Sequence, residues 1–210
     1  PHIKVIGVEP SGAACMKASL EQGEVVTLPH VNTIADGTAV QTPGEHIFPY
    51  LQENLDDVIT IDDDELIVAF LDMVENHKMI VENSGLLTVA ALRHLNFTGK
   101  KVVSILSGGN MDVITMSSVV QHGLIQRDRI FTVSVLIPDK PGELVRVASI
   151  IAENQGNVIK LDHNQFISTN RYAAVELKVT LEAYGTDHKK KIVKALEEAG
   201  CKPKIIRANL

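Results

Sequence analysis

Short runs of β-branched and aliphatic residues alternate with helical patterns over the first 125 residues. The runs predict strands at residues 3–8, 58–61 and 101–106. Apolar residues at helical spacing predict helices at residues 11–23, 84–95 and 112–122, and a further helix that starts at Asp62. Ser11 is the predicted cap of the first helix. This alternation predicts an α/β domain at residues 1–125, a partial doubly wound sheet that is mainly parallel with helices on both faces.

A different pattern begins after residues 123–129. Residues 131–137 alternate as a half-buried strand, residues 138–142 form a turn, and a helical stripe from Leu144 to Ile151 ends at Gly156. Strands are then expected at 157–165 and 172–181, a helix ending at Gly200, and a short strand at 204–206. The order βαββαβ predicts a ferredoxin-like second domain at residues 126–210.

The acidic run at residues 62–65 is compatible with a metal site or a helix start. Its spacing lacks the alternating ligands and the glycine of a calcium loop. Carboxylates interact favourably with the N-terminal end of the helix dipole, and apolar residues at helical spacing follow. We therefore expect a helix start here.

Composition narrows the classes of function. Aromatic residues make up 4% of the chain and Trp is absent, so the core must be aliphatic, which suits covered parallel sheets. The net charge of −6 argues against nucleic acid and anionic membranes as partners. The longest purely apolar run, residues 66–71, is too short to span a membrane. Cys15 and Cys201 lie far apart, which predicts free thiols in the cytoplasm.

The segment LSGGNMD, at residues 106–112, joins a predicted strand to a predicted helix. Its two glycines permit a sharp turn, and Ser107, Asn110 and Asp112 are all typical helix caps. Alternatively, the exposed backbone and the Ser107 hydroxyl face a ligand at the end of the sheet. Composition and spacing leave both interpretations open.

Four phrases in order resemble one enzyme family: VIGVEPSGAACM (5–16), TIADGTAV (33–40), VENSGLLTVAAL (81–92) and VVSILSGGNMD (102–112). Together they resemble the C-terminal part of threonine dehydratases, or threonine ammonia-lyases, which are fold-type-II enzymes dependent on pyridoxal 5′-phosphate. The tail from Arg129 resembles an ACT domain, a small module that senses amino acids. The resemblance covers essentially the whole chain.

The resemblance implies a cofactor site. Ser107 would lie beside the pyridine nitrogen, Gly108 would let the backbone pass close to the ring, and Gly37 would line the same pocket. Glu82 would lie near the cofactor face, although its phrase, Glu-Asn-Ser-Gly, departs from the family's Glu-Gly-Ala-Gly or Glu-Pro-Thr-Ala-Gly. The alternatives are a helix cap for Ser107, an Asp-Gly turn at Gly37 and a helix-start carboxylate for Glu82.

The resemblance also implies that parts of the enzyme are missing here. The family's Schiff-base lysine and its phosphate-binding glycine loop belong upstream of Pro1, so we expect residues before Pro1 and no catalytic residue in this chain. The parent enzyme would convert L-threonine, and L-serine as a second substrate, to a 2-oxo acid and ammonia. The 210-residue chain alone is predicted to be inactive. A non-catalytic regulatory fragment that binds amino acids is the alternative. A nucleotide-binding domain is disfavoured, because no Gly-x-Gly-x-x-Gly follows the first strand.

Two further sites follow from the resemblance. Glu9 and the carbonyl of Ala13 match cation ligands of relatives, but Cys15 replaces their aspartate, which argues for a monovalent cation or none rather than a divalent one. The expected effector site of the ACT domain comprises Asp139, Gly142, Leu144 and Asn157, usually across a dimer interface. A turn and a helix cap are the alternatives. We expect a homodimer or homotetramer.

Overall fold

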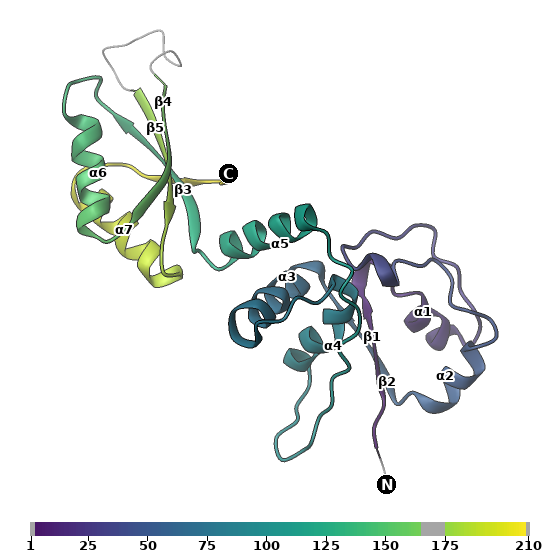
Figure 1. Cartoon of the computed structure of the whole chain (residues 1–210). Helices are drawn as coiled ribbons and strands as arrows, with labels where there is room; N and C mark the ends of the chain where they lie inside the picture. Colours follow the sequence, from purple (N-terminus) through teal and green to yellow (C-terminus); the bar gives the residue numbers. More distant parts are fainter. Residues whose placement is uncertain (1–2, 165–174, 209–210) are drawn as a thin grey trace. The chain divides into compact units, whose positions relative to one another are not determined.

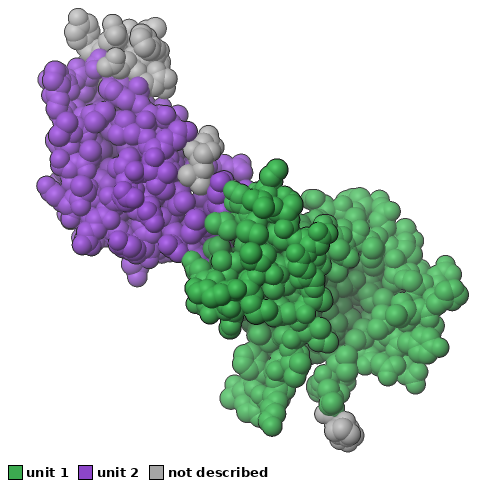
Figure 2. Space-filling model, viewed as in Figure 1, with its two compact units in different colours: residues 1–120 green, residues 121–210 purple. Residues whose placement is uncertain are grey.

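The computed structural model describes residues 3–164 and 175–208 of the chain, and it divides into two compact units. Unit 1 comprises residues 1–120 and unit 2 residues 121–210 (Figure 2). The division between the units, after Val120, falls within helix α5 (Val113–Gln126). The predicted domain boundary after residue 125 lies in the same helix. This helix is longer than predicted because it continues through Gly123.

Unit 1 is built on a pair of parallel strands. β1 (Ile6–Pro10) pairs with β2 (Asp57–Ile61) in a register that aligns Ile6 with Asp57 and Pro10 with Ile61. Helices α1 (Cys15–Gln22) and α2 (Phe48–Asn54) lie on one side of this pair, and α3 (Asp63–Asp72) and α4 (Leu87–Ala90) on the other (Figure 1). The parallel pairing and the flanking helices are as predicted. The core is mostly aliphatic, with Ile61, Leu66 and Leu86 fully buried, and it also contains the aromatic residues Phe48 and Phe70.

The acidic run begins a helix, which confirms the prediction. Asp62 is the N-cap of α3 and forms a capping box with Glu65, whose carboxylate accepts the Asp62 N–H at 3.2 Å. The helix continues as a π turn at Met73–His77. Among the described residues no group of three or more acidic, His or Cys side chains is arranged for a metal ion.

The predicted cap of the first helix is wrong. A 3₁₀ turn at Ser11–Ala13 intervenes, so α1 begins only at Cys15. The Ser11 hydroxyl instead donates to Asp62 Oδ1 at 2.5 Å, far along the chain. The end of the helix is as predicted, because Gly23 adopts φ = 77° and donates its N–H to the Ser19 carbonyl.

The predicted strand at residues 101–106 is also wrong. Strand structure requires a neighbouring strand, and within the described part of unit 1 only β1 and β2 pair, with each other. The segment runs beside the helical stretch around α4, where the Ser104 hydroxyl donates to the Thr88 carbonyl and the Thr88 hydroxyl to the Ile105 carbonyl. Val103 and Ile105 remain 87% and 73% exposed. The β-branched side chains of Val103 and Ile105 are therefore not packed into the core of unit 1.

The stretch predicted as one helix at residues 84–95 is helical throughout but not uniform. It consists of a 3₁₀ turn (Asn83–Leu86), α4 and a second 3₁₀ turn (Ala91–His94). Leu86, Leu87, Ala90 and Ala91 are buried, in agreement with its apolar pattern. A further 3₁₀ turn, Asp36–Thr38, lies in the long segment before α2.

Unit 2 contains the predicted βαββαβ order. It comprises β3 (Ile130–Ile137), α6 (Glu143–Glu153), β4 (Asn157–Asn164), β5 (Val175–Glu182), α7 (Thr186–Glu198) and β6 (Lys204–Ile206). The strands form an antiparallel sheet in the order β4-β5-β3-β6. Parts of two predicted strands, at Gln165 and at residues 172–174, lie outside the described residues. Val133, Val135, Leu177 and Leu181 form a core with Val147 and Ile151 of α6 and Ile192 and Leu196 of α7.

The prediction that β3 is only half buried is wrong. Thr132 and Ser134, on its polar face, are 4% and 7% exposed. Thr132 and Thr180 share a hydroxyl–hydroxyl hydrogen bond of 2.9 Å, and the Ser134 hydroxyl donates to Glu176 Oε1 at 2.6 Å. Cross-strand partners thus satisfy the polar groups and allow their burial.

Cys15 and Cys201 are both buried and unbridged, as predicted. Within the described ranges, no helix is both long and apolar enough to cross a membrane.

Candidate functional site

Three segments of unit 1 converge on the side chain of Glu82. They are the Asp36–Thr38 turn, the start of the 3₁₀ turn at Asn83, and the loop that contains Ser107 and Gly108. Glu82 Oε2 accepts the Asn110 N–H at 3.0 Å. A Cβ atom added to Gly37 would lie 2.8 Å from Ser84 Oγ and 3.7 Å from Glu82 Oε1. The predicted residues Gly37, Glu82 and Gly108 therefore lie close together in space.

Glycine is required at two positions of this site. Gly108 adopts φ = 79°, and a Cβ atom there would overlap the Glu82 carboxylate. Gly85 is buried, and a Cβ atom there would overlap the carbonyl oxygen of Ser107. The backbone of the Ser107–Gly108 turn consequently passes directly over the start of the helical stretch that follows Glu82.

Asp112, rather than Ser107, caps helix α5. Asp112 Oδ1 accepts the N–H groups of Ile114 at 2.9 Å and Thr115 at 3.0 Å, and the Thr115 hydroxyl donates to Oδ2. The Thr115 hydroxyl, followed by the Thr115 N–H, holds the pKa of Asp112 below its usual value. Ser107 is exposed and lies five positions before the cap. Its hydroxyl is therefore not needed for helix capping.

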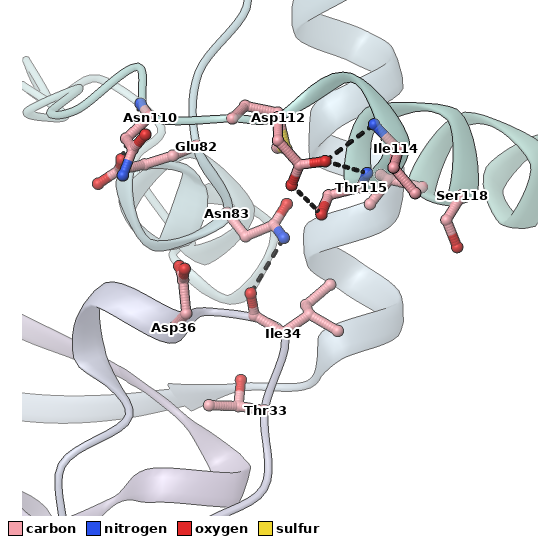
Figure 3. Close-up of a pocket in the computed structure, with 12 residues that line it drawn as sticks. Thr33, Ile34, Asp36, Glu82, Asn83, Asn110, Asp112, Ile114, Thr115 and Ser118 are labelled. Carbon is pink, nitrogen blue, oxygen red and sulfur yellow. Dashed lines mark hydrogen bonds between the residues drawn. The ribbon is translucent and has the colours of Figure 1, made fainter.

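A cavity of about 440 Å³ adjoins Glu82 (Figure 3). Its walls come from residues 33–36, from Glu82 and Asn83, and from residues 110–119, which include the start of α5. The lining residues are Thr33, Ile34, Asp36, Glu82, Asn83, Asn110, Met111, Asp112, Ile114, Thr115, Ser118 and Val119.

Two polar atoms beside Glu82 are buried without a hydrogen-bond partner among the described residues. They are Asn83 Oδ1 and Ser84 Oγ. Asn83 is 4% exposed, and its Nδ2 donates to the Ile34 carbonyl at 3.0 Å. Sequence reasoning missed both residues as functional candidates. The available signal was the pair Asn83-Ser84, which departs from the Gly-Ala or Pro-Thr-Ala of the resembling family.

These residues are compatible with a bound planar cofactor. Gly37 and Gly108 leave space where any other residue would place a side chain against Ser84 or Glu82. The unpaired Ser84 hydroxyl and the exposed Ser107 hydroxyl are available for polar groups of a ligand. The alternative roles also match the structure, because Gly37 lies in the 3₁₀ turn Asp36–Thr38 and Glu82 is the N-cap residue of the 3₁₀ turn that begins at Asn83.

Glu9, one of the two predicted cation ligands, accepts hydrogen bonds at the start of a helix. The Glu9 carboxylate accepts the N–H groups of Met16 at 2.9 Å and Lys17 at 2.8 Å, so it serves the N-terminus of α1. Burial, followed by the neighbouring charge of Glu9, raises the pKa of the Cys15 thiol. A protonated thiol is a poor metal ligand. Ala13 is buried in the preceding 3₁₀ turn.

The four predicted effector residues separate into two groups. Asp139, Gly142 and Leu144 lie at the N-terminal end of α6, where Gly142 adopts φ = 94° as the N-cap and provides no side-chain cap. Asn157 begins β4 beyond the other end of α6, and its Nδ2 donates to Glu182 Oε2 at 3.2 Å. Since α6 has 11 residues, its ends are about 16 Å apart. One copy of the chain therefore does not unite these residues in a single site.

The family profile described as "Pyridoxal-phosphate dependent enzyme" matches residues 1–108. Among curated proteins, the chain is 35% identical over 202 residues to an L-threonine ammonia-lyase of Geobacter sulfurreducens, covering 95% of this chain and 50% of that protein. It is 31% identical over 207 residues to an L-threonine ammonia-lyase of Thermotoga maritima, covering 98% and 52%. The chain thus spans about half the length of these relatives.

Two solved structures of enzymes resemble part of the chain. The processed form of threonine deaminase isoform 2 from Solanum lycopersicum matches with a TM-score of 0.52 at 35% identity, covering 57% of this chain and 36% of that one. Maize serine racemase matches with a TM-score of 0.50 at 34% identity, covering 57% and 40%.

The parallel strand pair flanked by helices defines unit 1 as an α/β domain. The chain belongs to the family of pyridoxal-phosphate-dependent enzymes, since that profile matches more than half of its residues. Pyridoxal 5′-phosphate is the cofactor of this family, in agreement with the sequence-based prediction.

Proposed function

We propose that this chain is the C-terminal portion of a pyridoxal-phosphate-dependent threonine ammonia-lyase. The whole enzyme would convert L-threonine to 2-oxobutanoate and ammonia, with L-serine as a second substrate. The observation that carries the proposal is the convergence of Gly37, Glu82 and Gly108 in a family member whose curated relatives act on threonine. Residues outside this chain would supply the lysine that binds the cofactor.

Each residue at the site has a distinct proposed role. When bound, pyridoxal phosphate supplies an electron sink that permits β-elimination from a hydroxy amino acid. The Ser107 hydroxyl would hydrogen-bond the pyridine nitrogen without the negative charge needed to keep a proton on it. Gly108 and Gly37 would admit the ring close to the backbone. Glu82, held by the Asn110 N–H, would fix the position of the Ser107–Asn110 turn.

The proposed role of residues 126–210 is that of a ferredoxin-like ACT regulatory domain. Its βαββαβ order supports this role. The N-terminus of α6 has no side-chain cap, so its N–H groups are suited to an effector carboxylate, with Asp139 near the amine. Because Asn157 lies at the opposite end of α6, we propose that it contacts effector bound to a second copy. This arrangement requires a homodimer or homotetramer.

The test begins with the complete gene product, supplied with pyridoxal phosphate and L-threonine. We expect formation of 2-oxobutanoate and ammonia, whereas residues 1–210 alone should form neither. Intact mass of the native product distinguishes the alternative. A mass near 22.9 kDa, combined with no turnover, would favour a non-catalytic protein that binds amino acids.

Replacing Ser107 tests the cofactor contact separately from turnover. In S107D a carboxylate would keep the pyridine nitrogen protonated, and the visible absorption band of the bound cofactor should shift. In S107A the hydrogen bond is lost and turnover should fall, while S104A, in the same segment, serves as the control. Spectra of S107D and S107A that both match the unaltered protein would refute the assignment.

A further inference from the structure

The Asn83 side chain leaves a hydrogen-bond acceptor unused inside the protein. Its Nδ2 donates to the Ile34 carbonyl at 3.0 Å, and this contact fixes the orientation of the amide, because the reversed amide would place two oxygens against each other. Oδ1 is buried and has no partner among the described residues. A buried acceptor of this kind is normally satisfied in the functional protein. A ligand that donates a hydrogen bond would satisfy it.

The cavity beside Asn83 is negatively charged. Asp36, Glu82 and Asp112 line it, and none of its described lining residues is Lys, Arg or His. In Figure 3, Asn83 lies between Ile34 and Asp112, with its nitrogen toward Ile34 and its oxygen toward the side of Asp112. The low pKa of Asp112 keeps that carboxylate ionised at neutral pH. Asp112 already accepts hydrogen bonds from Ile114 and Thr115, so the unpartnered acceptor is Asn83 Oδ1, and the Asp112 carboxylate adds negative charge on the same side.

These features define the chemistry of the ligand. A carboxylate-bearing ligand would be repelled, because none of the described lining residues carries a basic side chain to receive it. The acidic side chains are not grouped as a metal site. A protonated amine, by contrast, donates hydrogen bonds to the amide oxygen and neutralises the charge of the carboxylates. The volume of about 440 Å³ also accommodates a ligand larger than water.

We propose that this cavity binds an ammonium-type cation, either ammonium itself or a small protonated primary amine, through Asn83 Oδ1 and the Asp112 carboxylate. Asp36 and Glu82 supply further negative charge at the cavity. The inference does not rest on the proposed lyase activity, although ammonium is a product of that reaction.

The test is a titration of the complete protein, labelled with ¹⁵N-asparagine, at constant ionic strength. Methylammonium and ammonium chloride should shift the side-chain amide signals of Asn83 to saturation, and the variant N83L identifies those signals by their loss. Tetramethylammonium, which has no N–H group, and potassium are the matched cations. They should produce no saturable shift.

Two variants examine the carboxylate. D112S removes the charge but retains an oxygen that caps α5, and the affinity for methylammonium should fall about tenfold or more. E45Q removes a charge from an exposed residue that does not line the cavity and should leave the affinity unchanged. Circular dichroism verifies that each variant is folded.

The outcomes separate cleanly. Saturation by ammonium but not by methylammonium supports the proposal with ammonium as the ligand. An equal response to potassium or tetramethylammonium, no saturation with either ammonium-type probe, or equal affinities in D112S and E45Q would each overturn it. None of these readouts depends on turnover of threonine, so failure of the lyase assay is distinguishable.

Discussion

Substitution of Gly108 by alanine should destabilise unit 1 more than substitution of its neighbour Gly109. Gly108 adopts φ = 79°, a conformation that costs a residue with a Cβ atom about 1–2 kcal/mol. The new methyl group would also overlap the Glu82 carboxylate. Because the end of the Glu82 side chain can swing aside, the cheaper relaxation is loss of its hydrogen bond with the Asn110 N–H, which adds about 1 kcal/mol. The expected loss is therefore about 2–3 kcal/mol.

The chain provides two matched controls for this prediction. A Cβ atom on Gly109 meets no atom within 4 Å and its φ is not positive, so G109A should change stability by less than about 0.5 kcal/mol. Gly23 adopts φ = 77° and also meets nothing within 4 Å, so G23A measures the backbone cost alone. The difference between G108A and G23A then isolates the overlap with Glu82.

Urea unfolding, followed by circular dichroism, supplies the free energy of unfolding of each variant. The order of stability should be G109A, then G23A, then G108A. A G108A protein as stable as G109A would refute the proposed packing of the turn against Glu82, and with it the glycine-lined site.

Three further predictions concern other parts of the chain. Lys189 donates to Asp128 at 2.7 Å and lowers the pKa of that carboxyl. The pair therefore stabilises unit 2 above the unfolded-state pKa of Asp128, and this contribution is lost as the pH falls through the folded-state pKa. Unfolding measured at a series of acidic pH values should show a weaker pH dependence in D128N than in the unaltered protein. T180V leaves the buried Thr132 hydroxyl unpaired and should lower the free energy of unfolding by about 1–3 kcal/mol. The T132V/T180V double variant should recover part of that loss in thermal unfolding. A double variant whose loss equals the sum of the two single effects would contradict this pairing. The Cys15 thiol, buried and with a raised pKa, should react with a disulfide reagent at neutral pH only after denaturation, and rapid labelling of the native protein at this position would contradict its burial.

Local patterns were sufficient where an element depends on nearby residues. The capping box at Asp62, the end of α1 at Gly23 and the alternation that produces β3 and β5 all follow from periods and caps that the sequence displays. The grouping of Gly37, Glu82 and Gly108 could be anticipated only through the family resemblance, because composition left a plain turn equally open.

Other features depended on contacts between distant segments. Residues 101–106 have the composition of a strand, but pairing requires a neighbour, and in the described chain the segment bonds to the helical stretch around Thr88 instead. The Ser11 hydroxyl donates to Asp62 instead of capping a helix, and the Glu9 carboxylate accepts the Met16 N–H at the start of α1. The sequence alone therefore determined most of the helices and strands, but not helix α2, the start of α1 or the conformation of residues 101–106. Only the tertiary structure decided which of these segments pair and which polar atoms, such as Asn83 Oδ1, are buried without a partner, because both depend on what lies opposite in space.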